Sequence, residues 1–203
     1  MFDVHFREGR MKLARSTHAL VALGGNLPLG DDRPDAVLRA AFDSLTTEGM
    51  RVVSVSRIYR TPAFPAGTGP DYANAAALVE VDALADPEAV LAALHRIEAA
   101  FGRVRGQRWA GRVLDLDLLA IGETILPDPG TQRQWQSLPP EDQARLAPDR
   151  LILPHPRLQD RAFVLVPLAD VAPDWRHPLS GLSVDQMLQA LPAEDVAAVV
   201  PWV

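Results

Sequence analysis

The chain has 203 residues, of which 48% are hydrophobic and 23% charged, and its formal net charge is −6. This length and composition predict a soluble globular domain whose core needs no disulfide or metal to hold it. Cysteine is absent, which excludes disulfides, thiolate nucleophiles, zinc knuckles and iron–sulfur clusters. The only lysine is Lys12, so a Walker A loop and a Schiff-base enzyme are strongly disfavoured.

Membrane and nucleic-acid partners are not expected from the sequence. No apolar run approaches the roughly 18 residues of a membrane span. The first ten residues carry four charges and lack the apolar region of a signal peptide. The acidic balance disfavours a general nucleic-acid binder, whose binding surface is usually basic. We therefore expect a soluble, cytoplasmic protein.

Strands and helices alternate along the first part of the predicted domain. Short apolar or alternating segments predict four strands, at His18–Gly24, Arg51–Tyr59, Tyr72–Val81 and Val113–Ile121. Two amphipathic helices separate them, one at Pro34–Thr47 and one that follows Asp86 and ends near Phe101. The resulting order, β-α-β-β-α-β, predicts an α+β fold of the split βαβ type, with an antiparallel sheet and both helices on one face.

Other segments are expected outside this pattern. Residues 1–16 predict an N-terminal extension, and residues 61–70 hold three prolines and two glycines, which predicts a loop. Residues 123–150 are rich in proline and glutamine and predict an insertion with one short helix. Helical additions are expected near the C-terminus, around Phe163–Val171 and Ser183–Leu191. We therefore predict a single domain over residues 17–203, with 123–150 inserted into it.

Two aspartates, Asp115 and Asp117, stand in the last predicted strand. Residues two apart on a strand share a face, so both carboxylates point one way while Leu114, Leu116 and Leu118 point into the core. A divalent cation would relieve the repulsion between the carboxylates, and oxygen ligands of this kind suit Mg²⁺ shared with phosphates. The alternative is the solvated face of an edge strand, and these residues alone leave both interpretations open.

An arginine-rich loop directly precedes the aspartates. No acidic residue stands between Glu98 and Asp115. Four arginines fall in this gap, at Arg103, Arg105, Arg108 and Arg112. Acids that hold Mg²⁺ and arginines that grip oxygens are the components of phosphoryl transfer, whereas for any single arginine a solvated salt bridge is an equal alternative. Trp109 in the same loop is either a core anchor or a cover over a ligand.

Two weaker clusters of polar and aromatic residues accompany these motifs. His155 stands between two prolines, which suits a phosphate contact or a proton donor, although a lone histidine is more often structural. Tyr72 and Asn74 start the third predicted strand, and the loop that precedes it contains Thr61, Pro62 and Phe64. Aromatic rings and an amide suit a planar heterocycle, and a plain polar strand end is the alternative.

Five motifs occur in order between about Ala19 and Pro173, with residues 123–150 left out: ALGGN, YRTP, PDYANA, GRVRGQRWAGRVLDLDLL and LPHPRLQDRAFVLVPLADVAP. Together they resemble the 6-hydroxymethyl-7,8-dihydropterin pyrophosphokinase family of folate biosynthesis. The resemblance implies a ferredoxin-like α+β sandwich. It also implies transfer of the β,γ-pyrophosphoryl group of ATP to the pterin hydroxymethyl, with release of AMP.

The resemblance further implies a role for each matching residue. Two Mg²⁺ ions would be held by Asp115 and Asp117. Catalysis would depend on Arg103, Arg112 and Asp117. The pterin would be bound by Thr61, Pro62, Phe64, Tyr72, Asn74, Trp109 and Phe163, with its ring between Tyr72 and Phe163. The positions on the ATP side are His95, Glu98, Arg105, Arg108, Arg150, His155 and Arg161.

Two other classes of protein share the predicted element order. RNA-binding modules place stacking aromatics on the first and third strands, but His18–Gly24 has none and the third strand has only Tyr72 at its edge. A small-ligand regulatory domain would not need a carboxylate pair beside an arginine loop. We therefore expect a monomeric enzyme that binds ATP and the hydroxymethyl pterin, and neither nucleic acid nor membrane.

Overall fold

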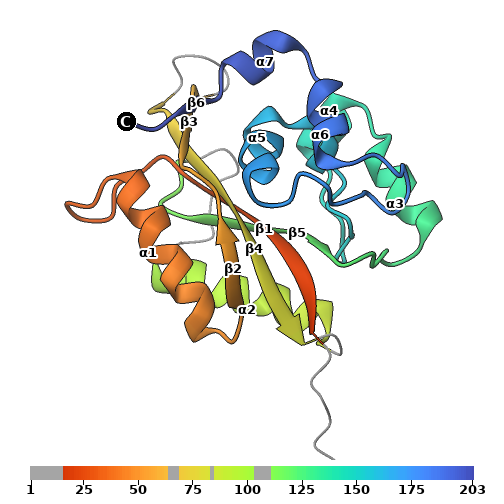
Figure 1. Ribbon diagram of the computed structural model, residues 1–203, viewed down its shortest axis with the longest axis horizontal. Coiled ribbons are helices and arrows are strands. Elements are labelled where there is room, and N and C mark those ends of the chain that lie inside the picture. The colour runs from red at the N-terminus through yellow and green to blue at the C-terminus, as the bar shows by residue number, and fades with distance from the viewer. Residues whose placement is uncertain (1–15, 64–68, 83–84, 103–110) are drawn as a thin grey trace, which may run out of the picture.

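The computed structural model describes residues 16–63, 69–82, 85–102 and 111–203 (Figure 1). Within this part of the chain one sheet has six strands: β1 (Ser16–Gly25), β2 (Arg51–Val55), β3 (Tyr59–Thr61), β4 (Tyr72–Asp82), β5 (Asp115–Ile121) and β6 (Val200–Pro201). β1 and β4 form the centre, β5 pairs with β1, and β2 and β3 both pair with β4. All these pairs are antiparallel, as predicted.

The helices lie on both faces of this sheet. Their bounds are α1 (Pro34–Thr47), α2 (Pro87–Ala100), α3 (Pro129–Gln136), α4 (Pro140–Arg145), α5 (Ala162–Val171), α6 (Val184–Gln189) and α7 (Ala193–Ala197). α1 and α2 cover one face, and α5 and α6 lie on the other side (Figure 1). This arrangement confirms the predicted α+β ferredoxin-like sandwich. None of the helices in the described ranges is long and apolar enough to cross a membrane.

The face under α1 and α2 carries the larger core. Alternate residues of β1, of β5 and of the position just before β5 point into it and are at most 3% exposed: Ala19, Val21, Leu23, Leu114, Leu116 and Leu118. Both helices begin at a proline, and the side chain of Asp86 accepts a hydrogen bond from Glu88 N at the start of α2. Because side chains alternate along a strand, the intervening residues of β1 and β5 are directed to the opposite face.

The opposite face has a second core, built around Leu20, Leu119 and Leu165. α5 supplies most of its helical side chains, and it is apolar nearly throughout. On this same face Tyr72, Asp115 and Asp117 are partly exposed. α5 and α6 therefore leave a polar area of the sheet accessible beside their core.

The predicted strand Arg51–Tyr59 is interrupted in the structure, which is a correction of its bounds. Ser56 N donates to Ala76 O at 2.9 Å, and the hydroxyl of Ser56 accepts from Ala76 N at 2.8 Å. A serine side chain therefore replaces a backbone acceptor, and the ladder stops between β2 and β3. The sequence could not reveal this break, because the alternating pattern continues through it.

The regions after β5 also contain more structure than predicted. The insertion holds two helices, α3 and α4, where one was expected. α7 and β6 were not predicted at all. β6 has only two residues and depends on a distant partner, since it pairs with β3 and Trp202 N donates to Ile58 O at 2.9 Å.

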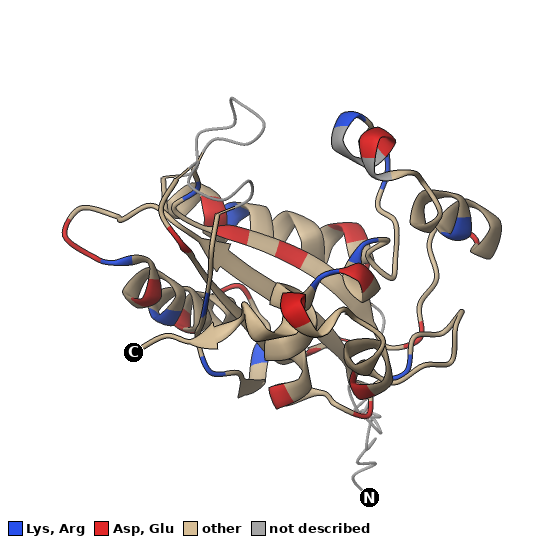
Figure 2. Ribbon diagram, turned by 90° about the horizontal axis from the view of Figure 1, so that it is seen from above, with Lys and Arg blue, Asp and Glu red and all other residues tan. Residues whose placement is uncertain are grey.

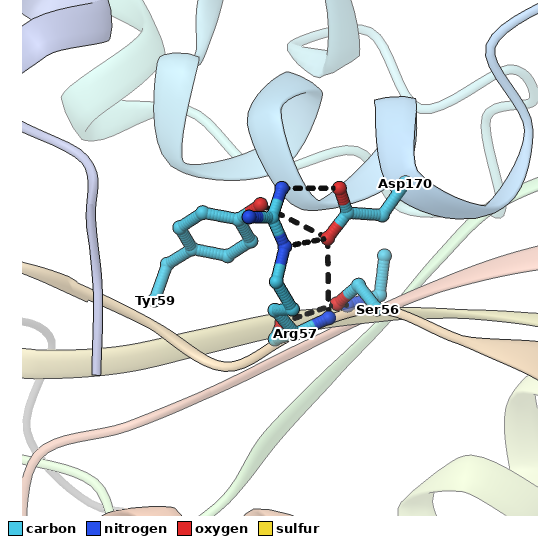
Figure 3. A network of polar contacts seen from close by, with 5 residues as sticks. Ser56, Arg57, Tyr59 and Asp170 are labelled. Carbon is cyan, nitrogen blue, oxygen red and sulfur yellow. Dashed lines mark hydrogen bonds and ion pairs between the residues drawn. The ribbon is translucent and has the colours of Figure 1, made fainter. Parts of the chain in front are cut away.

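A polar network fastens α5 to the junction of β2 and β3 (Figure 3). Asp170 of α5 accepts from Arg57 N and Nε at 3.1 Å each, and from the Tyr59 hydroxyl at 2.9 Å. Burial raises the pKa of Tyr59 to about 12, and the bond to Asp170 adds to the effect. Burial acts to raise the pKa of Asp170 as well, but the bonds from Arg57 and Tyr59 outweigh it and hold this pKa below its usual value.

We expect Tyr59→Phe to lower the free energy of unfolding at pH 7 by about 1.5 kcal/mol, because it removes a buried hydrogen bond to a charged acceptor. The folded-state pKa of Asp170 is lowered, so its contribution is present above the unfolded pKa and is lost as the pH falls through the folded value. The Tyr59→Phe penalty should therefore shrink towards pH 3. Urea unfolding from pH 7 to 3 measures it, with Tyr72→Phe as the control; a penalty independent of pH would contradict the role of the Asp170 charge.

Candidate active site

The acid pair lies on β5 as predicted, on the face opposite α1 and α2. Asp115 is opposite Gly24 of β1, and Asp117 is opposite Ala22. On the next strand, Gly24 is opposite Asn74 and Ala22 is opposite Ala76. No side chain larger than a methyl group therefore stands on β1 between the carboxylates and β4. Figure 2, a view from above, shows acidic segments on the sheet and both acidic and basic segments on the helices and loops around it.

Arg112 is held directly before β5 by Asn26. Asn26 is 4% exposed; its Oδ1 accepts from Arg112 N at 2.8 Å, and its own N donates to Arg112 O at 2.8 Å. The guanidinium of Arg112 pairs with Asp115. Burial lowers the pKa of Arg112, but the charges of Asp115 and Asp117 outweigh it and raise the pKa overall. Arg112 therefore stays charged beside the acid pair.

Sequence reasoning did not single out Asn26 as a functional residue. The signal was the motif ALGGN, in which Asn26 follows two glycines. Its side chain also donates to Pro70 O at 3.3 Å, so it joins the end of the 61–70 loop to the start of β5. The end of β1 passes close to the backbone of Val113, and this approach needs a glycine at position 25. A Cβ there would lie 2.3 Å from Val113 O.

The predicted pterin residues Thr61, Tyr72 and Asn74 meet on neighbouring strands. Asn74 Nδ2 donates to Thr61 Oγ1 at 2.8 Å, and the two residues are 5% and 9% exposed. Thr61 is opposite Tyr72 in the register. The bond to Thr61 directs the Asn74 Oδ1 atom towards Gly24. A Cβ atom at position 24 would lie 3.4 Å from this oxygen. Pro62 is exposed at the start of the loop.

Arg161 and Phe163 lie next to each other at the start of α5. The Arg161 guanidinium lies 5.6 Å from the centre of the Phe163 ring, and Phe163 is 40% exposed. Burial lowers the pKa of Arg161, and the charges of Asp117 and Asp115 partly offset this. The side chain is therefore a half-buried cation within electrostatic reach of both acids.

His155 approaches Asp117 from the segment that precedes α5. Its N donates to Leu119 O at 2.8 Å, and its Nδ1 accepts from Arg157 N at 3.1 Å. Because Nδ1 is an acceptor, the proton of the neutral ring is on Nε2. Burial lowers the pKa of His155; Asp117 opposes the shift, and Arg161 and Arg157 add to it. His155 is therefore a neutral Nε2–H donor near the acid pair.

Other predicted residues are placed differently or are not described. Glu98 is 1% exposed and accepts from Leu116 N at 2.8 Å, and with His95 it belongs to α2, which covers the other face. Arg150 is exposed and pairs with the neighbouring Asp149 at 3.1 Å. The role of these three residues on the ATP side stays a prediction. Five predicted residues lie outside the described ranges: Phe64, Arg103, Arg105, Arg108 and Trp109.

Comparison with known proteins identifies the family. Residues 20–173 match the family described as 7,8-dihydro-6-hydroxymethylpterin-pyrophosphokinase (HPPK). The 2-amino-4-hydroxy-6-hydroxymethyldihydropteridine pyrophosphokinase of Synechocystis sp. is 38% identical over 184 residues, covering 90% of this chain and 80% of that protein. The protein of the same name from Pseudomonas aeruginosa is 36% identical over 177 residues, covering 87% and 93%.

Solved structures support the fold. The crystal structure of wild-type Plasmodium falciparum HPPK-DHPS aligns with a TM-score of 0.58 at 13% identity and covers 86% of this chain. This chain spans 44% of the length of that longer chain, and the similarity supports the architecture alone. The match to the family, by contrast, includes β5 with its acid pair, His155 and the start of α5. The chain belongs to the 7,8-dihydro-6-hydroxymethylpterin-pyrophosphokinase family.

Proposed function

We propose that this chain transfers the β,γ-pyrophosphoryl group of ATP to the hydroxymethyl of 6-hydroxymethyl-7,8-dihydropterin, releases AMP, and uses two Mg²⁺ ions bound at Asp115 and Asp117. Pyrophosphate transfer to this pterin, in folate biosynthesis, is the activity of the family to which the chain belongs. One observation supports this location of the site: Arg112 pairs with Asp115, and Arg161 lies within electrostatic reach of both acids.

The donor set at the acid pair fits magnesium. Among the described residues, no group of three or more histidine, aspartate or glutamate side chains could enclose a metal. Mg²⁺ is usually bound through one or two carboxylates and takes its other ligands from substrate phosphates and water, so Asp115 and Asp117 suffice. When bound, the ions would neutralise the charge of the triphosphate.

The cationic and donor groups around the acid pair would orient the triphosphate. Arg112 pairs with Asp115, so we expect its guanidinium to turn to a phosphate oxygen as Asp115 takes up metal. Arg161 presents a second guanidinium, and His155 presents an Nε2–H donor. Attack by an alcohol on phosphorus needs charge neutralisation and alignment more than covalent catalysis, and these groups supply both. That Arg103, Arg105 and Arg108 also orient the triphosphate stays a prediction.

The pterin would bind across β1 from the acid pair. The Asn74 amide, oriented by Thr61, offers hydrogen bonds to the edge of a heterocycle. Phe163 belongs to α5 on the same side of the sheet and is 40% exposed, which suits stacking on a planar ring opposite Tyr72. Pro62 borders this region. That Phe64 and Trp109 also bind the pterin stays a prediction.

The nucleotide product tests the proposal. The protein is incubated with ATP, Mg²⁺ and the hydroxymethyl pterin, and the nucleotides are separated by chromatography. AMP in equal amount to the pterin diphosphate supports pyrophosphoryl transfer. ADP would indicate transfer of a single phosphoryl group, and no turnover would contradict the activity.

We also propose that the active unit is a monomer formed by one domain over residues 17–203. The described site residues come from β1, β3, β4, β5, α5 and the segments before β5 and α5, all within one chain. Light scattering during size-exclusion chromatography tests this, and an active species that is only a dimer would contradict it.

A further inference from the structure

The insertion after β5 is joined to the segment that carries His155. Leu126 N donates to Leu153 O at 2.9 Å, and Leu153 N donates to Leu126 O at 3.2 Å. Asp128 then caps α3, because its side chain accepts from Gly130 N at 2.8 Å and from Thr131 N at 3.0 Å. The start of the insertion is therefore anchored next to Leu153.

Gln132 of α3 is fully buried, at 0% exposure. Its Nε2 donates to Pro154 O at 3.2 Å. The other amide atom, Oε1, is buried and has no hydrogen-bond partner among the described residues. A buried amide with only one of its two polar atoms hydrogen-bonded destabilises the folded state, because the other atom has lost its contacts with water. An apolar side chain would pack there without this cost in free energy. The position therefore calls for an explanation beyond packing.

The peptide group between Pro154 and His155 is held at both of its polar atoms. Its carbonyl oxygen accepts from Gln132, and its N–H, which belongs to His155, donates to Leu119 O at 2.8 Å. Leu119 lies on β5, two residues after Asp117. Because a peptide group is planar, two bonds on its opposite sides fix its orientation and hence the direction in which the His155 side chain leaves the backbone.

We propose that Gln132 is a positioning residue for the nucleotide site: its hydrogen bond to Pro154 O, from the insertion, holds His155 in place to donate to the triphosphate. This inference rests on the proposed function. Gln132 is fully buried, so it offers no surface to the nucleotide. We therefore expect Gln132 to affect nucleotide binding only through His155. Pterin binding, on β3 and β4, should not depend on Gln132.

Gln132→Met tests the proposal, because methionine keeps the length and volume of the side chain but removes the donor. We expect the Kd of a non-hydrolysable ATP analogue with Mg²⁺, measured by calorimetry, to rise about three- to tenfold, the usual effect of one hydrogen bond. The Kd of the pterin should stay within about twofold, and the histidine NMR signal assigned to His155 should shift in the free protein. Trp175→Phe is the matched control, since it also removes one side-chain bond to a carbonyl, from Nε1 to Gly122 O at 3.1 Å.

A double-mutant cycle with His155→Ala separates positioning from general stability. If Gln132 acts through His155, Gln132→Met should have no further effect on analogue binding once His155 is alanine. An equal effect in both backgrounds would overturn the proposal. So would an ATP-analogue Kd that matches the Trp175→Phe control, or a parallel loss of nucleotide and pterin binding.

A second variant covers the case in which Gln132→Met does not fold. Gln132→Asn keeps the amide but is one methylene too short to reach Pro154 O, so it should weaken nucleotide binding in the same way, and unchanged binding would overturn the proposal. Failure of the underlying function looks different: the unmodified protein would then form no AMP. AMP formation by the unmodified protein together with unaffected Gln132 variants would contradict this inference alone.

Discussion

Asp117→Asn is expected to lower the rate of AMP formation by about a thousandfold or more, because it removes a negative charge that would hold Mg²⁺ against the triphosphate. Asparagine keeps the shape of the side chain, so β5 and its pairing with Ala22 should persist. The measurement is kcat with ATP, pterin and Mg²⁺ at saturation. Thermal unfolding of the same variant reports whether the fold is retained.

The control for this variant is Asp174→Asn, which removes an exposed carboxylate outside the site. It should leave kcat within about twofold of the unmodified protein. Removal of divalent ions with a chelator should likewise stop the reaction, and added Mg²⁺ should restore it. A near-normal rate for Asp117→Asn would refute the metal role of the acid pair.

Arg112→Ala is expected to lower kcat by about a hundred- to a thousandfold while changing the KM for ATP much less. The guanidinium pairs with Asp115, which places its charge where the metal and the reacting phosphates would meet. The bonds between Arg112 and Asn26 use only backbone atoms of the arginine. The substitution therefore removes the charge and leaves the backbone bonds between residue 112 and Asn26 intact.

Arg39→Ala, which removes an exposed arginine of α1, is the control for this second experiment. Arg112→Lys should recover only part of the rate, because an ammonium group cannot contact two phosphate oxygens in the geometry of a guanidinium. Steady-state kinetics with varied ATP at saturating pterin separate kcat from KM. A change confined to KM would show that Arg112 only binds the nucleotide.

Several features of the site were predictable because they depend on short stretches of sequence. The period of two along β5 predicted that Asp115 and Asp117 share a face, and the burial of the leucines that alternate with them, Leu114, Leu116 and Leu118, confirms it. Proline at the start of α1 and α2, with Asp86 before α2, predicted where these helices begin. These signals are local, since neighbouring residues in one strand or helix fix the direction of each side chain.

Contacts between distant segments were not predictable in this way. Asn26 meets Arg112 across 86 positions, and Gln132 meets Pro154 across 22. Glu98 stays a prediction for the ATP side, and its bond from Leu116 N joins α2 to β5. No local pattern encodes which buried amide or carboxylate meets which backbone group, because each bond forms only after the sheet and helices have packed.

The amino-acid sequence by itself therefore determined α1, α2 and the main strands up to β5, the acid pair and the family of this protein, all of which depend on local periodicity and on motifs. Only the tertiary structure decided the break at Ser56, the pairing of Arg112 with Asp115 and the support of His155 from the insertion. The physical reason is the same in each case: a buried polar group must find a partner, and that partner is set by packing in three dimensions.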